Sequence, residues 1–185
     1  MPETVPYDPV AAAKALAPQI RAARDEVEEL RRMPASLVKA LSQAGLLQLH
    51  LPRSLGGRET DPITAYLAIE EISKIDGSVG WCAFLSSDSS IMMGWIGREA
   101  GLEIVGQPPD SSFAGSLRPQ GVAFAVDGGY RVSGRWDFVS GGDHAKWLLC
   151  TCKVVDAAGP VMRRTGVQDT RTLVLPIKSV QVHDV

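Results

Sequence analysis

The apolar residues of this chain follow two different spacings, one in each half. In residues 1–107 they recur every three or four positions, which places them on one face of a helix. From residue 108 onward apolar and polar residues alternate, which is typical of strands with one buried face. The pattern therefore predicts an α+β protein, with an all-helical domain at 1–107 and an antiparallel β domain at 108–185.

Residues that cap helices set the predicted limits of the helical elements. Asp8 and Asp61 each precede a proline, a pair that favours an N-cap and the first helical position. Pro18 is expected to kink or split the first helix, while Gly45 and Gly77 are expected to end the second and third. Helices are predicted at 9–32, 34–44, 62–76, 78–97 and 98–106.

Turn residues divide the second half of the chain into short strands. Asp127, Gly128 and Gly129 separate two alternating runs, which predicts a tight hairpin. The final alternating run, VQVHDV at 180–185, has no polar tail or helix after it, so the β domain is expected to be incomplete. Strands are predicted at 113–117, 122–126, 130–138, 146–155 and 170–177.

Composition and charge exclude some partners. The net charge is −2 and the basic residues are scattered, whereas a nucleic-acid surface needs clustered Lys and Arg. No apolar run approaches the roughly 20 residues that span a bilayer, so no membrane partner is expected. The first residues, MPETVPYDPV, lack the pattern of a secretory signal, and a cytoplasmic location is expected.

Common catalytic and metal-binding motifs are missing from the sequence. It contains no GxGxxG, P-loop or HExxH signature, and no Gly-x-Ser-x-Gly motif surrounds the serines at 86–90. His50, His144 and His183 lie in separate predicted elements, so no metal site is expected.

The second half instead contains a group of aromatic and hydroxyl residues next to glycines. These are Phe113, Ser116, Trp136, Phe138 and Ser140, on strands that the hairpin would bring together. An apolar wall with a nearby hydrogen-bond donor suits a flat aromatic cofactor, and the glycines at 141 and 142 would let the backbone approach it. The same aromatic residues would also suit the core of a sheet, so the residues alone leave both interpretations open.

Four segments resemble the acyl-CoA dehydrogenase superfamily, and specifically its branch of two-component flavin-dependent monooxygenases. They are LPRSLGGRETDP (51–62), EEISKIDGSVGW (70–81), FAGSLRPQGVA (113–123) and GGYRVSGRWDFVSGGDHAKW (128–147). The resemblance implies a helical N-terminal domain, a β-barrel middle domain and a C-terminal four-helix bundle. This chain would contain the helical domain and an incomplete barrel, with the bundle absent.

The resemblance also implies which residues form the site. Phe138, Val139 and Ser140 match the segment that lies against the flavin ring, with the Ser140 hydroxyl facing N5 as the catalytic group. Ser116 and Leu117 fall in a second flavin-contacting strand. On the substrate side, Trp81 matches an aromatic residue of a helix beside the cavity. Further along that helix, many hydroxylating relatives have a histidine, and this sequence has Asp88, Ser89 and Ser90, of which Ser89 is taken as substrate-facing.

The implied function is that of an oxygenase component. It would use reduced flavin (FMN or FAD) and O2 to hydroxylate a small aromatic substrate through a C4a-hydroperoxyflavin. A separate flavin reductase would supply the reduced flavin, and full-length relatives would form homo-oligomers. Two alternatives stay open: an acyl-CoA dehydrogenase with bound FAD, and a truncated flavin-binding fragment without activity.

Overall fold

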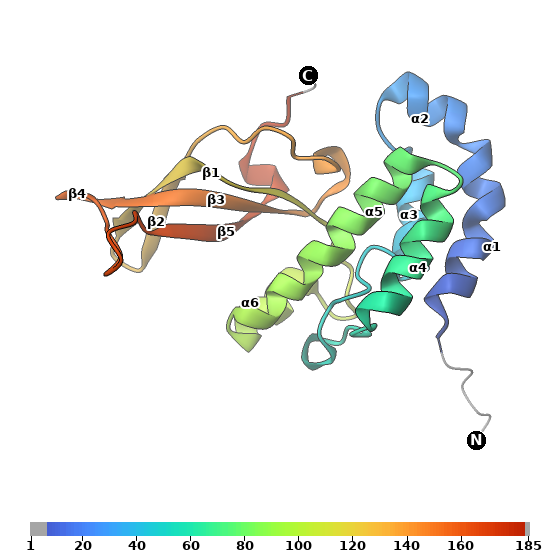
Figure 1. The fold of residues 1–185 in the computed structure, drawn as a ribbon, viewed down its shortest axis with the longest axis horizontal. Helices are drawn as coiled ribbons and strands as arrows, with labels where there is room; N and C mark the ends of the chain where they lie inside the picture. The colour runs from blue at the N-terminus through green and yellow to red at the C-terminus, as the bar shows by residue number, and fades with distance from the viewer. Residues whose placement is uncertain (1–6, 184–185) are drawn as a thin grey trace.

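A computed structural model describes residues 7–183; the remaining residues, which include the start of MPETVPYDPV and the end of VQVHDV, lie outside the described part. Figure 1 shows the helices gathered on one side and the sheet extending away from them, with α5 nearest the sheet. The helices are α1 Pro9–Ala22, α2 Arg24–Leu30, α3 Ala35–Gln43, α4 Pro62–Ser73, α5 Gly77–Ser90 and α6 Arg98–Val105. The strands are β1 Phe113–Val126, β2 Gly129–Ser133, β3 Trp147–Asp156, β4 Gly159–Pro160 and β5 Thr170–Pro176. Short 3-10 turns are η1 Arg53–Leu55, η2 Ile91–Trp95, η3 Gly142–His144 and η4 Ile177–Ser179.

Two of the predicted helix starts are confirmed by their caps. The Asp8 carboxylate accepts hydrogen bonds from the backbone N–H groups of Val10 and Ala11, and Asp61 accepts one from Thr64. The helix predicted at 9–32 is not split at Pro18, because α1 continues through that residue to Ala22 and α2 begins only at Arg24; a kink at Pro18 stays a prediction. A proline removes a single N–H from the helix ladder, and burial of Ala13 and Ile20 on either side holds α1 together.

The role predicted for Gly77 is wrong. Helix α4 ends at Ser73, and Gly77 is the first residue of α5. The reason is Asp76, whose carboxylate accepts hydrogen bonds from the N–H groups of Ser78 and Val79 at 2.9 and 3.0 Å. Asp76 is therefore an N-cap, and the turn between the two helices is completed before Gly77 is reached.

The sheet differs from the antiparallel arrangement that the sequence predicts. Its strands follow the order β2-β1-β3-β4, with β5 also paired to β3. The β1–β2 hairpin and the pairs of β3 with β4 and β5 are antiparallel as expected, whereas β1 and β3 are parallel. Among the described strands, β2 and β5 have one free edge each, so the sheet is open and closure into a barrel stays a prediction.

Two strand limits are also corrected. The predicted strands at 113–117 and 122–126 are one long strand, β1, whose pairing with β3 is interrupted between Ser116 and Gly121. The predicted strand at 130–138 ends at Ser133, and the segment 134–138 has no strand partner. Aromatic residues and alternation therefore predict a strand in this segment, although the chain leaves the sheet at Gly134.

Three buried clusters support the fold. One lies between α1, α3, α4 and α5, and another lies against the sheet around Ala114, Leu148 and Cys150. The third joins the two parts, because Leu51, Leu55 and Met93 pack with Phe113 and Leu149. The domain boundary at residues 107 and 108 falls between α6 and β1 and stays a prediction. Within residues 7–183, no helix is long and apolar enough to cross a membrane.

Candidate functional site

Trp136 anchors the segment that the sequence singled out, Gly134–Ser140. Its indole Nε1 donates a hydrogen bond to the Thr151 carbonyl of β3 at 2.9 Å, and its ring packs with the buried cluster at the sheet. A Cβ built on Gly121 would lie 2.1 Å from this ring, so the indole fits only because residue 121 is glycine. Trp136 is therefore part of the packing beneath the segment, and Phe113 is also core, at 2% exposure.

Phe138, two residues after Trp136, does not share this packing. Its side chain is 82% exposed, and its backbone has the positive φ of +60° that a bulky residue rarely adopts. The guanidinium carbon of Arg118 lies 5.7 Å from the centre of the ring. The structure thus brings Phe138 next to β1, whose Leu117 is 73% exposed.

Ser140 lies at the start of a glycine turn that reaches α5. Gly141 has a φ of +80°, and a Cβ built on it would lie 3.7 Å from the Cys82 sulfur of α5. The neighbouring Val139 is half-buried against the sheet cluster. Within residues 7–183, neither the hydroxyl nor the backbone N–H of Ser140 has a hydrogen-bond partner, so both are available to a ligand.

The other residues expected at a flavin site lie on β1. Ser116 is buried at 8% exposure and pairs with Cys150 of β3, and the pairing is interrupted directly after it. Residues 117–120 consequently bulge from the parallel ladder. The bulge and the segment 134–140 lie side by side, as the contact between Arg118 and Phe138 requires.

The two substrate-side residues both lie on α5, but not together. Trp81 is 53% exposed and its ring is 5.5 Å from that of Phe84. Ser89 is half-buried and about 12 Å further along the helix axis, eight residues at the rise of an α-helix. Cys82, the residue after Trp81, lies beside the Ser140 turn. Ser89 lies closer to the start of β1, where Ser86 accepts a hydrogen bond from the Phe113 N–H.

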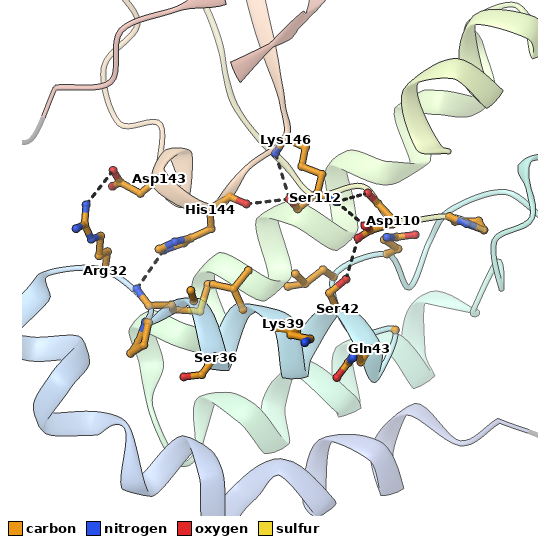
Figure 2. A pocket seen from close by; sticks show the side chains of 18 of the residues that line it. Arg32, Ser36, Lys39, Ser42, Gln43, Asp110, Ser112, Asp143, His144 and Lys146 are labelled. Carbon is orange, nitrogen blue, oxygen red and sulfur yellow. Dashed lines mark hydrogen bonds and ion pairs between the residues drawn. The ribbon is translucent and has the colours of Figure 1, made fainter. Parts of the chain in front are cut away.

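A cleft of about 1400 Å³ lies elsewhere, at the junction between α3 and residues 108–112 and 143–146. We call it the seam cleft; Figure 2 shows Arg32 facing Asp143 and Ser42 facing Asp110 across the junction. Lys146 Nζ contacts the Asp110 carboxylate at 2.6 Å, and Arg32 contacts Asp143 at 3.9 Å. None of the residues that the sequence assigns to the site lines this cleft.

His144 lines the seam cleft, and its contact there could not be predicted from the sequence. Its Nε2 accepts a hydrogen bond from the backbone N–H of Met33, between α2 and α3, at 3.2 Å. Burial lowers the pKa of His144 below its ordinary value, against the opposing effect of Asp143. A neutral imidazole therefore joins the two parts of the molecule. No local signal marks such a contact, because its partners are 111 positions apart in the sequence.

A family model described as the acyl-CoA dehydrogenase N-terminal domain matches residues 10–102. The chain belongs to the acyl-CoA dehydrogenase family. Among the relatives of this family member, the oxygenase subunit HsaA of a flavin-dependent monooxygenase from Rhodococcus jostii is 32% identical over 171 residues. The match covers 92% of this chain and 43% of that relative.

Two further comparisons concern proteins described with FADH2. The oxygenase component of an FADH2-dependent resorcinol hydroxylase from a Rhizobium strain is 37% identical over 130 residues, which are 70% of this chain and 32% of that relative. The structure of XiaF from Streptomyces in complex with FADH2 and glycerol matches with a TM-score of 0.85 at 26% identity. It covers 96% of this acyl-CoA dehydrogenase-family chain and 43% of the XiaF chain. The chain thus spans less than half the length of these relatives.

Proposed function

We propose that this chain contributes the flavin-facing part of the oxygenase component of a two-component flavin-dependent monooxygenase that acts on a small aromatic substrate. The observation that carries the proposal is Phe138, an exposed aromatic ring held in an unfavourable backbone conformation beside a glycine turn. Such strain is found mainly where function requires it. A relative described as an FADH2-dependent resorcinol hydroxylase and a similar structure in complex with FADH2 support the same assignment.

The residues of the segment fit a flat cofactor with a polar edge. Phe138 and Leu117 offer exposed apolar surface, and Val139 would exclude water behind the ring. The Ser140 hydroxyl and N–H are donors without a protein partner among the described residues, and we assign them to the N5 edge of the flavin. Ser116 would contact a second edge of the flavin ring from β1. Trp81 and Ser89 of α5 would face the substrate.

Reduced flavin bound at this segment would supply the activation of O2 for monooxygenation, in which one oxygen atom enters the substrate and the other leaves as water. The protein would bind the cofactor, orient it and keep water from its reacting edge. A separate reductase would supply reduced FMN or FAD, since the relatives are oxygenase components. We further propose a cytoplasmic location and a homo-oligomeric full-length protein.

The proposal is tested by anaerobic titration of the chain with reduced and then oxidised FMN and FAD, followed by tryptophan fluorescence. Tighter binding of a reduced flavin is expected, because that is the form an oxygenase component receives. Tight binding of oxidised FAD, with reduction of that FAD by an acyl-CoA, would instead indicate a dehydrogenase. Absence of binding to any of the four would contradict a flavin site in this chain.

A second experiment addresses Ser140 itself. Ser140→Ala removes the hydroxyl assigned to N5, so we expect the variant to release hydrogen peroxide faster than the unchanged protein. Ser133→Ala is the matched control, because Ser133 is an exposed serine of β2 outside the flavin-facing segment. The assay is the rate of hydrogen peroxide release after each protein, loaded anaerobically with reduced flavin, is mixed with air-saturated buffer. Equal rates of release from all three proteins would contradict this role.

A further inference from the structure

Gln120 occupies the point at which β1 rejoins the sheet. The pairing of β1 with β3 stops after Ser116 and resumes at Gly121, so Gln120 is the last residue of the bulge. Its side-chain Nε2 donates a hydrogen bond to the Asp137 carboxylate at 2.8 Å. Its Oε1 accepts one from the Asp137 backbone N–H at 3.2 Å. Both ends of one amide therefore hold the residue that directly precedes Phe138.

The segment 134–138 needs such a contact because the sheet does not hold it. It has no strand partner, so no ladder of backbone hydrogen bonds fixes its dihedral angles. Trp136 fixes one point of the segment through Thr151. The next residue is fixed by Gln120, and the left-handed backbone of Phe138 follows at once. A strained conformation persists only where its surroundings determine it.

We infer that Gln120 is a positioning residue: its two hydrogen bonds to Asp137 hold Phe138, Val139 and Ser140 in the conformation that faces the flavin. The part of this inference that concerns flavin binding rests on the proposed function. Gln120 lies on the bulge of β1 and is not assigned any contact with the cofactor. It acts through the backbone of the segment 137–140.

An exchange of donor and acceptor tests the contact. In Gln120→Glu the new carboxylate can still accept from the Asp137 N–H, but it faces the Asp137 carboxylate where an amide had donated. Adding Asp137→Asn to Gln120→Glu restores the hydrogen bond with its direction reversed, because the side-chain amide introduced at position 137 can donate to the carboxylate introduced at position 120. Asp137→Asn alone is the control, because its side-chain oxygen can still accept from Gln120. The exposed ion pair of Arg135 with Asp137, at 3.6 Å, is lost equally in both proteins that carry Asp137→Asn.

Amide hydrogen exchange in the whole chain without flavin reports the contact at two hydrogen-bonded amides: Asp137, whose N–H donates to Gln120 Oε1, and Gly142, whose N–H donates to the Val139 carbonyl at 3.0 Å. We expect exchange about tenfold faster in Gln120→Glu, and reduced-flavin affinity about tenfold lower in anaerobic titration with FMN and FAD. The double variant is expected to return both to within about twofold of the unchanged protein. Exchange elsewhere in the sheet and the free energy of unfolding should change little, since the contact is at the surface.

The outcomes separate this inference from the proposed function. Unchanged exchange in Gln120→Glu, or faster exchange with unchanged flavin affinity, overturns the positioning role while the unchanged protein still binds reduced flavin. Failure of the double variant to recover either quantity overturns it as well. Failure of the unchanged protein to bind reduced flavin overturns the proposed function, and the flavin-facing role of Gln120 with it.

Discussion

Phe138 combines two features that stability alone does not favour. A bulky residue with a positive φ costs free energy, and an aromatic ring that is 82% exposed recovers little of it by burial. The neighbouring residues explain how the conformation is kept, since Trp136 and Asp137 are both fixed by side-chain hydrogen bonds. The ring is therefore displayed at some cost to the folded state.

Replacement of Phe138 separates the backbone cost from the function of the ring. Glycine adopts a positive φ without the penalty that alanine pays, so we expect Phe138→Gly to be more stable than Phe138→Ala by about 1 kcal/mol. Both variants lack the ring, and both should bind reduced flavin about tenfold more weakly. Urea unfolding and anaerobic titration measure the two effects. Equal stability of the variants would show that the φ of +60° carries no strain.

At this scale the sequence revealed part of the site. The glycines after Ser140 predict a turn there, and the family resemblance singled out Phe138 and Val139. The positive φ of Phe138 could not be predicted, because nothing in a phenylalanine favours it. Gln120 also gave no signal, since its partner Asp137 becomes a neighbour only when the bulge and the turn come together.

Among the elements, the turn between α4 and α5 is governed by a cap. The sequence offers both Asp76 and Gly77, either of which could mark a helix limit. The structure favours the aspartate, whose carboxylate bonds to two N–H groups of α5, while Gly77 has open space around it and an ordinary φ.

A pair of alanine substitutions distinguishes the two roles. Asp76→Ala removes the cap, and we expect it to lower the free energy of unfolding by about 1 kcal/mol. Gly77→Ala should leave stability unchanged or raise it by up to about 1 kcal/mol, because alanine suits a helix better than glycine. Both are measured by urea unfolding. A large loss of stability in Gly77→Ala would restore Gly77 as the residue that ends α4.

Helices and strands were not equally predictable. Helix starts depend on residues a few positions apart, which is why Asp8 and Asp61 identify them correctly. Strand pairing depends on contacts between distant segments, and alternation along β1 and β3 is the same whether they run parallel or antiparallel. The aromatic residues of the segment 134–138 predict a strand by their propensity, although the contacts that hold the segment come from side chains.

In the whole molecule, the two parts are joined by the hydrophobic cluster around Leu55 and Phe113 and by the polar contacts of the seam cleft. Among the polar contacts of the seam cleft, the one made by His144 depends on its protonation. Its Nε2 must be unprotonated to accept a hydrogen bond from the Met33 N–H. The charged groups nearest to it are Asp143, which favours protonation, and Arg32, which opposes it. Burial is the larger effect and lowers the pKa in the folded state.

This lowered pKa predicts a loss of stability in mild acid. The unfolded chain binds a proton on His144 near its ordinary pKa of about 6.5, and the folded chain does so only at lower pH. The contribution of His144 is thus complete above about pH 6.5 and declines as the pH falls through that value toward the folded pKa. Urea unfolding between about pH 7.5 and pH 5 should show a larger decline for the unchanged protein than for His144→Gln, which cannot titrate. Identical pH profiles would contradict this role for His144.

The position of β3 has a consequence for how the chain is completed during synthesis. Strands β1, β4 and β5 all pair with β3. Strand β3 begins 34 positions after the start of β1, and β4 and β5 follow it in the sequence. Contacts within the helical cluster of α1, α3, α4 and α5 require no residue beyond Phe84. During synthesis the helical part can therefore emerge from the ribosome and pack first. The edge of β1 that faces β3 stays unpaired until Trp147–Asp156 has emerged.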